Sequence, residues 1–517
     1  MNKDSNKLYA ETPPVKLFFT AAIPGVIGMF AMSIYNIIEG IFVGKFIGGD
    51  AFAAMNLAMP LVFITFALSD MIGVGSSVPI SIAHGKGDNE RANNIFSCSV
   101  LLIVFTAIIT GTLMFSFAPV LIRLMGAEDE VARLAVTYLR INAVMNPLTA
   151  LVFAMDNYMK ICGFIRRSMT LNVFMSCLQI GLLVLFVVVL NLGLVGSAFA
   201  INLGMATCSV IALLPFVRGR ALLKFKRPKF ELPVLKETIA CGSPTFLNNI
   251  AGRLFSLVVN VLLIRMGGTM AVSAFSVLMY CSDLVQPFLY GLCDSMQPSI
   301  GFNWGAGAYR RVKSLVKCVF TSTAIVSVVA VILMFFLPRQ IASIFVSGSD
   351  TALLDLSAHA LRLFSVEFLF WWFGYASQSF YNAIEKPKNA TIITLSTAIV
   401  FPLIMVVLLW PLGLDGLWLN QAASYVPVGM WEYCWGFIVG SINTMISAYF
   451  YSTKRSGQAI ALNIIRSLVM NSIVITFVPM IFGKAVVWHT FGIFEVLVLI
   501  IAITIKKHSE RKGVIYK

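Results

Sequence analysis

The sequence has little charge for its length. Only 12% of its 517 residues are charged and 59% are hydrophobic, whereas soluble proteins average about 25% charged residues. So few charges could not cover the surface of a water-soluble protein, which excludes soluble enzymes, nucleic-acid-binding modules and disordered chains. The hydrophobic 59% amounts to about 305 residues, enough for about 12 to 15 spans of 20 to 25 residues. Because the apolar runs are unbroken rather than alternating, we predict an all-α polytopic membrane protein and not a β-barrel.

Patterns for metals, disulfides and nucleotides are also lacking. The nine cysteines are scattered without a CxxC pair and the four histidines are far apart, so we expect no disulfide framework, structural metal or cofactor. Gly85-Lys86-Gly87 lacks the GxxxxGK(S/T) spacing of a phosphate-binding loop. The sequence contains neither an HExxH motif, nor a GxSxG motif, nor a cluster of catalytic acids, so no pattern in it indicates an enzyme. The polar N-terminus predicts no cleavable signal peptide. Energy for any pumping would therefore come from an ion gradient or from a partner.

The charge that is present is mostly positive and unevenly placed. Lys and Arg outnumber Asp and Glu by 38 to 23, and we attribute the excess to cytoplasmic loops facing the lipid bilayer rather than to nucleic-acid binding. Basic residues gather in alternate loops, at 84–91, 160–167, 218–229, 310–317 and 386–388. This distribution predicts a multi-pass protein with a cytoplasmic N-terminus.

The chain repeats itself at a shift of about 220 residues, which is the mark of a doubled unit. The matches keep their order along the chain: Gly48-Gly49 corresponds to Gly267-Gly268, Pro79 to Pro298, and Leu192-Gly193-Leu194 to Leu412-Gly413-Leu414. The unit contains six predicted spans, so both copies share one orientation and are related by a pseudo-two-fold axis along the membrane normal. Secondary transporters commonly place a substrate path between such halves.

The repeat defines the expected domains. We predict an N-terminal six-helix lobe at 1–217, a basic cytoplasmic linker at 218–232 and a C-terminal lobe at 233–430. The remaining 431–517 is still strongly apolar and predicts additional C-terminal helices, interpreted as a partial repeat of the preceding spans. The total is about 14 spans.

Ionisable side chains inside the predicted spans are few, and each is costly unless it has a partner or a function. Glu39 lies in the later part of the first span, and Asn36 lies about one turn earlier on the same helix face. A carboxylate that takes up a proton or cation on one side and releases it on the other couples ion movement to transport. We therefore predict cation coupling at Glu39 and Asn36, the alternative being a structural hydrogen bond to a neighbouring helix.

Other polar and aromatic residues of the spans are candidates for a substrate cavity. Two aromatic side chains, Trp371 and Tyr375, would stack on a flat organic cation, but such groups also serve packing or interfacial belts. Amides inside spans often join helices instead of binding ligands. The candidates are Asp70, Asn157, Gln179, Asn260, Asp294, Glu367, Trp371 and Tyr375.

Several stretches resemble a known family. Residues 35–44, 47–51 and 73–87 resemble the first two helices of the multidrug and toxic compound extrusion (MATE) family, and Gln297-Pro298 with 303–307 resembles its helix 8 and the following loop. The resemblance covers about residues 12–430 and looks closest to the bacterial branch that includes DinF-like and staphylococcal multidrug exporters. It implies twelve helices in two lobes, and export of cationic or amphipathic drug-like compounds driven by H⁺ or Na⁺ influx. It also implies a monomer in the bacterial plasma (inner) membrane.

The resemblance assigns roles to single residues. In many members an acid in helix 1 carries the coupling, and Glu39 occupies that position. Asn157 matches an asparagine common in helix 4, and Asp294 matches an acidic position of helix 8 seen in some members. Gln179 stands where helix 5 usually has Asn, and Leu183 replaces an Asp that many members have four residues later. We therefore expect a multidrug antiporter working by alternating access.

One alternative from the same superfamily stays open, a lipid-linked glycan flippase. Its substrate carries an anionic diphosphate, so it would need a basic cavity. An acidic and aromatic cavity would favour drug cations instead.

Overall fold

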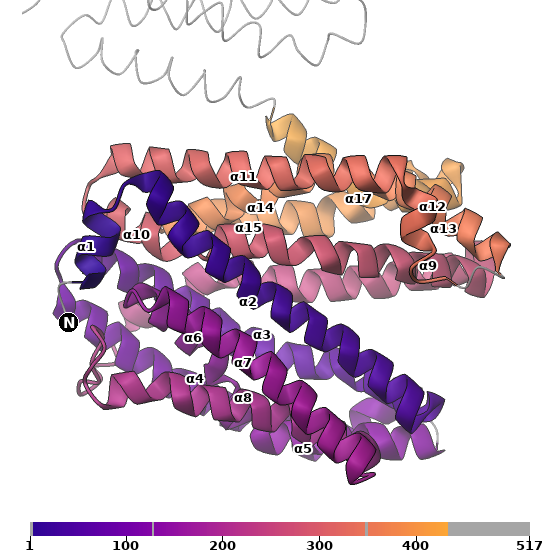
Figure 1. Cartoon of the computed structure of the whole chain (residues 1–517), viewed down its shortest axis with the longest axis horizontal. Coiled ribbons are helices and arrows are strands. Elements are labelled where there is room, and N and C mark those ends of the chain that lie inside the picture. Colours follow the sequence, from indigo (N-terminus) through magenta and orange to yellow (C-terminus); the bar gives the residue numbers. More distant parts are fainter. Residues whose placement is uncertain (1–3, 127–128, 347–349, 433–517) are drawn as a thin grey trace, which may run out of the picture. The chain divides into compact units, whose positions relative to one another are not determined.

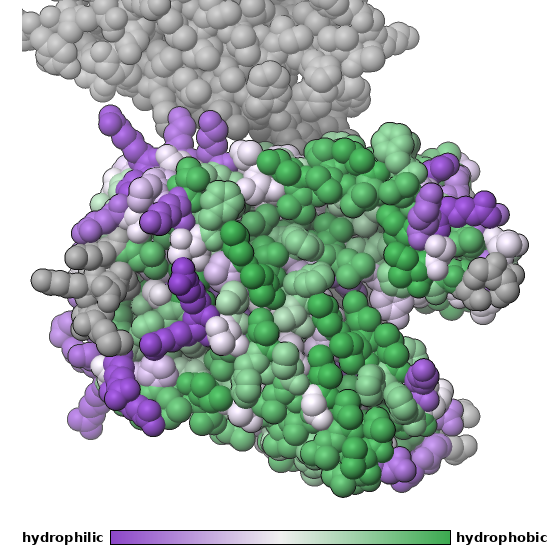
Figure 2. Space-filling model, in the orientation of Figure 1, coloured by the Kyte–Doolittle hydropathy of each residue, from purple (hydrophilic) through white to green (hydrophobic). Residues whose placement is uncertain are grey.

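The computed structural model describes residues 4–126, 129–346 and 350–432, and the regular structure within these ranges is helical. The chain divides into two compact units, Met1–Ser424 and Tyr425–Lys517, and two helical bundles make up the first. Eight of the described helices are long and apolar enough to cross a membrane. Apolar side chains cover their flanks and polar ones lie at their ends (Figure 2). The predicted helices at 431–517 lie, from residue 433 on, outside the described residues.

The first half of the chain forms a helical bundle (Figure 1). A short helix α1 (Asp4–Glu11) precedes it. The first bundle consists of α2 (Pro14–Phe42), α3 (Gly49–Gly85), α4 (Asn89–Leu124), α5 (Asp129–Thr149), α6 (Leu151–Ile161), α7 (Ile165–Leu183) and α8 (Gly193–Val217). Wide π-turns extend α2 over Val43–Ile47 and α7 over Val184–Val189.

The second half forms a second bundle. It consists of α9 (Leu232–Asp294), α10 (Gln297–Gly305), α11 (Tyr309–Phe336), α12 (Pro338–Ala342), α13 (Thr351–Ser365), α14 (Phe368–Ala383), α15 (Pro387–Leu395) and α16 (Phe401–Leu408), and α17 (Leu414–Glu432) follows. A π-turn (Ser396–Val400) joins α15 to α16, and a 3₁₀ turn (Trp410–Leu412) precedes α17. Figure 1 shows α2 crossing from the second bundle to the first, and its contacts with α7, α9 and α11 agree with this path.

Equivalent turns recur in the two bundles. Gly87 and Gly307 follow α3 and α10 with φ of 80° and 71°, whereas Gly193 begins α8 and Gly413 directly precedes α17, with φ of 57° and 60°. These left-handed conformations favour glycine. Both pairs are offset by 220 residues, the shift found in the sequence. A π-turn also follows α7 and another follows α15, at a slightly smaller offset than the glycine pairs.

All five basic loops of the sequence lie at one end of the bundles, together with α1 (Figure 1). They coincide with or adjoin the helix connections 86–88, 162–164, 218–231, 306–308 and 384–386. We call this the basic end. Here the linker is fixed to α4: the backbone N–H groups of Lys224 and Lys229 donate to Asn93 and Asn94 at 2.7 and 2.8 Å.

The bundles approach each other most closely through glycines of α3 and α9. A Cβ placed on Gly75 would lie 2.0 Å from the carbonyl oxygen of Thr238, and one placed on Gly242 would lie 1.8 Å from that of Met71. Small residues allow such backbone contact between membrane helices. The contact closes the space between the bundles toward the basic end.

A methyl group at this contact should therefore destabilise the protein. Gly242→Ala places the new Cβ against the Met71 carbonyl, and overpacking of this kind costs about 1–3 kcal/mol. We expect a lower Tm for the purified protein in detergent. Gly181→Ala on α7, whose Cβ would meet nothing within 4 Å, is the control and should keep the Tm of the unmodified protein. Equal Tm values for the two variants would contradict the tight contact.

Candidate functional site

A cavity of about 360 Å³ lies between the two bundles. Its walls come from α2, α3, α5, α6 and α8 of the first bundle and from α9, α10 and α14 of the second. Figure 2 shows the bundles separated by a hollow at the end opposite the basic end. Because the glycine contacts close the other direction, the cavity is reached from one side.

Two acids face this cavity from different bundles. Asp294 of α9 accepts a hydrogen bond from the Tyr375 hydroxyl, which lies 3.0 Å from each carboxylate oxygen, and another from Gln297 at 3.0 Å. Asp70 of α3 lies beside the Asn249 side chain of α9, and its carboxylate is close enough to Asp294 for the two charges to repel. A positive charge placed between them would relieve that repulsion.

A third acid of the cavity has a cation of its own. The Lys160 ammonium lies 2.6 Å from Oδ2 of Asp156, and the two side chains are only 7% and 14% exposed. Ser168 and Asn172 of α7 donate to the other oxygen, Asn172 at 3.0 Å. Lys160 belongs to the basic stretch 160–167 but does not lie in a loop. It lies in the last turn of α6, where the Asp156 four residues earlier compensates its burial.

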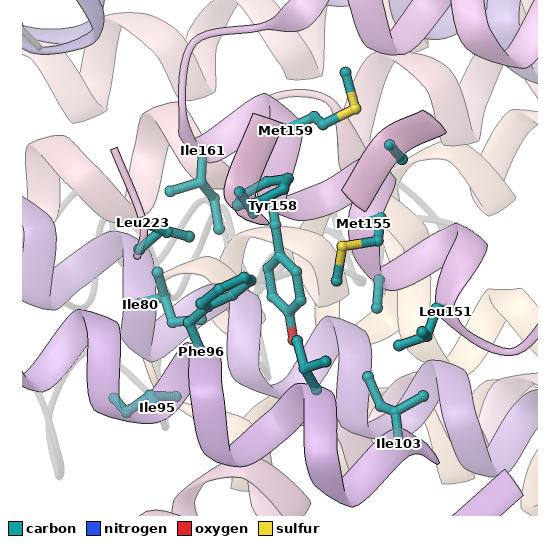
Figure 3. Close-up of a cluster of buried hydrophobic side chains, with 14 of the residues drawn as sticks. Ile80, Ile95, Phe96, Ile103, Leu151, Met155, Tyr158, Met159, Ile161 and Leu223 are labelled. Carbon is teal, nitrogen blue, oxygen red and sulfur yellow. The ribbon is translucent and has the colours of Figure 1, made fainter. Parts of the chain in front are cut away.

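The opposite face of α6 fixes these polar groups in place. Leu151, Met155 and Tyr158 belong to a buried apolar cluster (Figure 3). The Tyr158 ring meets Phe96 edge-on at 5.1 Å between centroids, and its hydroxyl lies 2.6 Å from Ser76 Oγ. Since one face of the helix is held in this core, the polar face with Asp156 and Lys160 lines the cavity.

The second bundle contributes an aromatic wall. Tyr290 and Tyr375 stack with centroids 4.2 Å apart and both line the cavity. Trp371 meets Tyr290 edge-on at 6.2 Å but lies outside the lining residues. Stacked tyrosines offer faces that attract organic cations. Methionines of the first bundle, Met29 and Met32 among them, line the facing wall.

The two predicted coupling residues, Glu39 and Asn36, lie in different environments. Glu39 is 2% exposed inside the first bundle, where Ser197 of α8 donates to it at 2.7 Å. The Tyr35 hydroxyl is buried beside the same carboxyl without a well-formed hydrogen bond. Asn36 lines the cavity, whereas Glu39 lies behind the wall, next to Tyr138, which lines it.

The eight predicted cavity residues divide evenly. Asp70, Asn157, Asp294 and Tyr375 line the cavity. Gln179 instead donates to the Ile201 carbonyl at 3.1 Å and joins α7 to α8. The other three, Asn260, Glu367 and Trp371, lie outside the lining residues, with Glu367 buried at the start of α14.

Sequence reasoning missed Lys160, Tyr290 and Gln297 as cavity residues. The Asp156–Lys160 spacing of four was an available signal for an ion pair. Within the described residues, no group of three or more His, Cys, Asp or Glu side chains is arranged to hold a metal ion.

Charged groups bridge the bundles at the basic end. Arg91 of α4 donates to both carboxylate oxygens of Glu237 of α9, at 3.0 and 2.8 Å. Glu385, in the connection 384–386, lies beside Glu237. Burial and the neighbouring Glu237 raise the pKa of Glu385 to about 7, and Lys86 and Arg91 act in the opposite direction. The protonated Glu385 is therefore the form that fits this closed contact.

This raised pKa predicts a pH-dependent basic end. Protons bind Glu385 more tightly in the closed contact than in water, so the stabilisation is present at low pH and is lost as pH rises through about 7. Spin labels at Glu90 and Lys388 should report a longer distance at about pH 8.5 than at about pH 5.5. Glu385→Gln should keep the shorter distance at both values, and an unchanged pH response in that variant would refute the assignment.

The fold and the cavity define a class of protein: a helical membrane transporter whose central cavity lies between two packed bundles. The MatE family model matches residues 24–185 and 244–408, one segment in each bundle. The chain belongs to the MATE family, whose members are transporters and not enzymes.

Known relatives cover most of the chain. The multidrug export protein MepA of Staphylococcus aureus (strain N315) is 24% identical over 410 residues, covering 78% of this chain and 90% of that protein. MepA of Staphylococcus saprophyticus is 23% identical over 420 residues, covering 80% and 92%. The chain is thus similar along most of its length to bacterial multidrug exporters.

Solved structures share the fold. An outward-facing multidrug resistance MATE family transporter of the MOP superfamily superimposes with a TM-score of 0.80 at 22% identity, covering 85% of this chain and 98% of that one. A MOP superfamily transporter from Pyrococcus furiosus, described as having a binding pocket of reverse polarity, gives 0.79 at 23% identity with the same coverage. At these identities the comparison establishes the fold alone.

Proposed function

We propose that this transporter is a secondary active multidrug antiporter that exports cationic or amphipathic organic compounds in exchange for H⁺ or Na⁺. The observation that carries the proposal is the placement of Asp70 and Asp294, from different bundles, on one cavity beside the Tyr290–Tyr375 stack. Carboxylates and aromatic faces together attract a flat organic cation. Methionine side chains adapt to ligands of different shape. The staphylococcal relatives are multidrug export proteins.

The proposed mechanism is alternating access by two lobes. Residues 1–217 and 233–430 form the lobes, related by a pseudo-two-fold axis along the membrane normal, and 218–232 is the basic linker. The paired glycine turns and the five basic loops at one end support this arrangement. The protein acts as a monomer in the bacterial plasma membrane with its N-terminus in the cytoplasm. Rocking of the lobes about the cavity would expose it to each side in turn.

The cavity disfavours the alternative of a lipid-linked glycan flippase. Among the described lining residues, three carboxylates stand against a single ammonium group: Asp70, Asp156, Asp294 and Lys160. An anionic diphosphate would be repelled by this excess of negative charge.

An efflux assay tests the proposal. Cells or proteoliposomes loaded with ethidium should lose the dye faster with the transporter than without it, and imposed Na⁺ and pH gradients applied separately identify the ion. Asp294→Asn should weaken dye binding about tenfold, because one charge facing the cation is lost. Asp355→Asn removes an exposed carboxylate paired with Arg339 and serves as the control. Dye efflux independent of both gradients would contradict antiport.

A second test concerns the coupling acid. Glu39→Gln should abolish drug resistance while the protein remains in the membrane, because Gln still accepts the hydrogen bond from Ser197 but cannot take up a proton or cation. Resistance is measured by growth in the presence of drug, and membrane content by immunoblot. Glu130→Gln, an exposed surface variant, should leave resistance intact. Full resistance with Glu39→Gln would rule out coupling at this residue.

A further inference from the structure

We infer that Lys160 is a fixed counter-cation of the cavity, which neutralises Asp156 and thereby lowers the affinity for doubly charged substrates relative to singly charged ones. The inference rests on the proposed function, since it concerns the substrates of the same cavity. It makes Lys160 a specificity-determining residue, although the residue adds a positive charge to a site that attracts cations.

The three cavity acids differ in their partners. The described partners of Asp70 and Asp294 are uncharged: Asn249, Tyr375 and Gln297. Asp156 instead holds the Lys160 ammonium at 2.6 Å and is satisfied on its other oxygen by α7. Asp70 and Asp294 are therefore available to bind a substrate cation, whereas Asp156 is already paired with Lys160.

The surroundings of Lys160 compensate its positive charge and hold the residue in place. It lies in the last turn of α6, where the free carbonyl groups of the helix end favour a positive charge. A buried lysine is tolerated when an acid pairs with it, and Asp156 lies one turn earlier. The Lys160 carbonyl oxygen also accepts a hydrogen bond from the Tyr9 hydroxyl, which fixes the backbone at the base of the cavity.

The ammonium group acts on more than its own partner. Lys160 interacts electrostatically with Asp294 of the opposite bundle, so its charge is felt where a substrate cation would sit. A unit charge about 10 Å away, at an effective dielectric constant near 20, changes the binding of another unit charge by about tenfold. The second charge of a dication adds a further effect of the same sign, which is smaller where that charge lies farther from Lys160, whereas a monocation has only the first.

Three variants separate charge from packing. Lys160→Met removes the ammonium and leaves Asp156 free, so the affinity ratio of a dication to a monocation should rise severalfold, by at most about tenfold. Asp156→Asn leaves the ammonium unpaired, so the ratio should fall by a similar factor. Lys160→Met combined with Asp156→Asn removes both charges and should return the ratio to that of the unmodified protein.

The probes are decyltrimethylammonium and decamethonium, which share a ten-carbon chain but carry one and two quaternary ammonium groups. Their affinities for the purified full-length protein are measured by displacement of ethidium. A purely structural ion pair would weaken both compounds equally in every variant and leave the ratio constant. A constant ratio in the two single variants therefore overturns the inference, even where expression or Tm falls.

The experiment also distinguishes this inference from the proposed function. If the unmodified protein binds ethidium and both probes but the ratio does not move, the multidrug function stands and the role of Lys160 is refuted. If the unmodified protein binds none of the three cations, the proposed function fails and the inference fails with it. A rise with Lys160→Met that the double variant reverses supports both.

Discussion

A charged side chain between membrane-spanning helices is stable only where another group compensates it, and this requirement organises the first and second bundles alike. Asp294 of α9 is held by Tyr375 of α14, and Glu39 of α2 by Ser197 of α8. Each hydrogen bond crosses from one helix to another. The groups that give the cavity and its wall their chemistry are therefore also the groups that hold the helices in register.

Two kinds of contact hold the cavity closed toward the basic end. Toward the basic end the backbones of α3 and α9 touch through Gly75 and Gly242, and α1 adds polar contacts to both bundles. Tyr9 is 1% exposed; its hydroxyl donates to the Lys160 carbonyl, and its own carbonyl accepts from Arg311 of α11 at 3.0 Å. Opening this end would break all of these contacts together. Both the glycine interface and the N-terminal segment therefore oppose that movement.

Much of the fold follows from the sequence, because it depends on composition and order. Long apolar runs, the repeat at about 220 residues and the basic loops indicate the helices, their pairing and the end they share. The site is less accessible, because helix rotation decides which side chains meet the cavity. Asp70 and Asp294 line it, whereas Gln179 joins two helices and Glu367 is buried at the start of α14. Residue type alone does not distinguish these environments.

The location of Glu39 constrains how an ion and a drug would be coupled. Its carboxyl lies behind the cavity wall, so a drug held near Asp70 and Asp294 does not contact it directly. The connection runs through α2, which is tied to α8 near Glu39 and packs tightly on α9 at Gly25, where an added Cβ would lie 2.8 Å from the Gly291 carbonyl. Under the proposed function, ion uptake at Glu39 alters the fit of α2 to the first bundle. Because α2 also packs on α9, that change reaches the interface between the bundles and biases which end is closed.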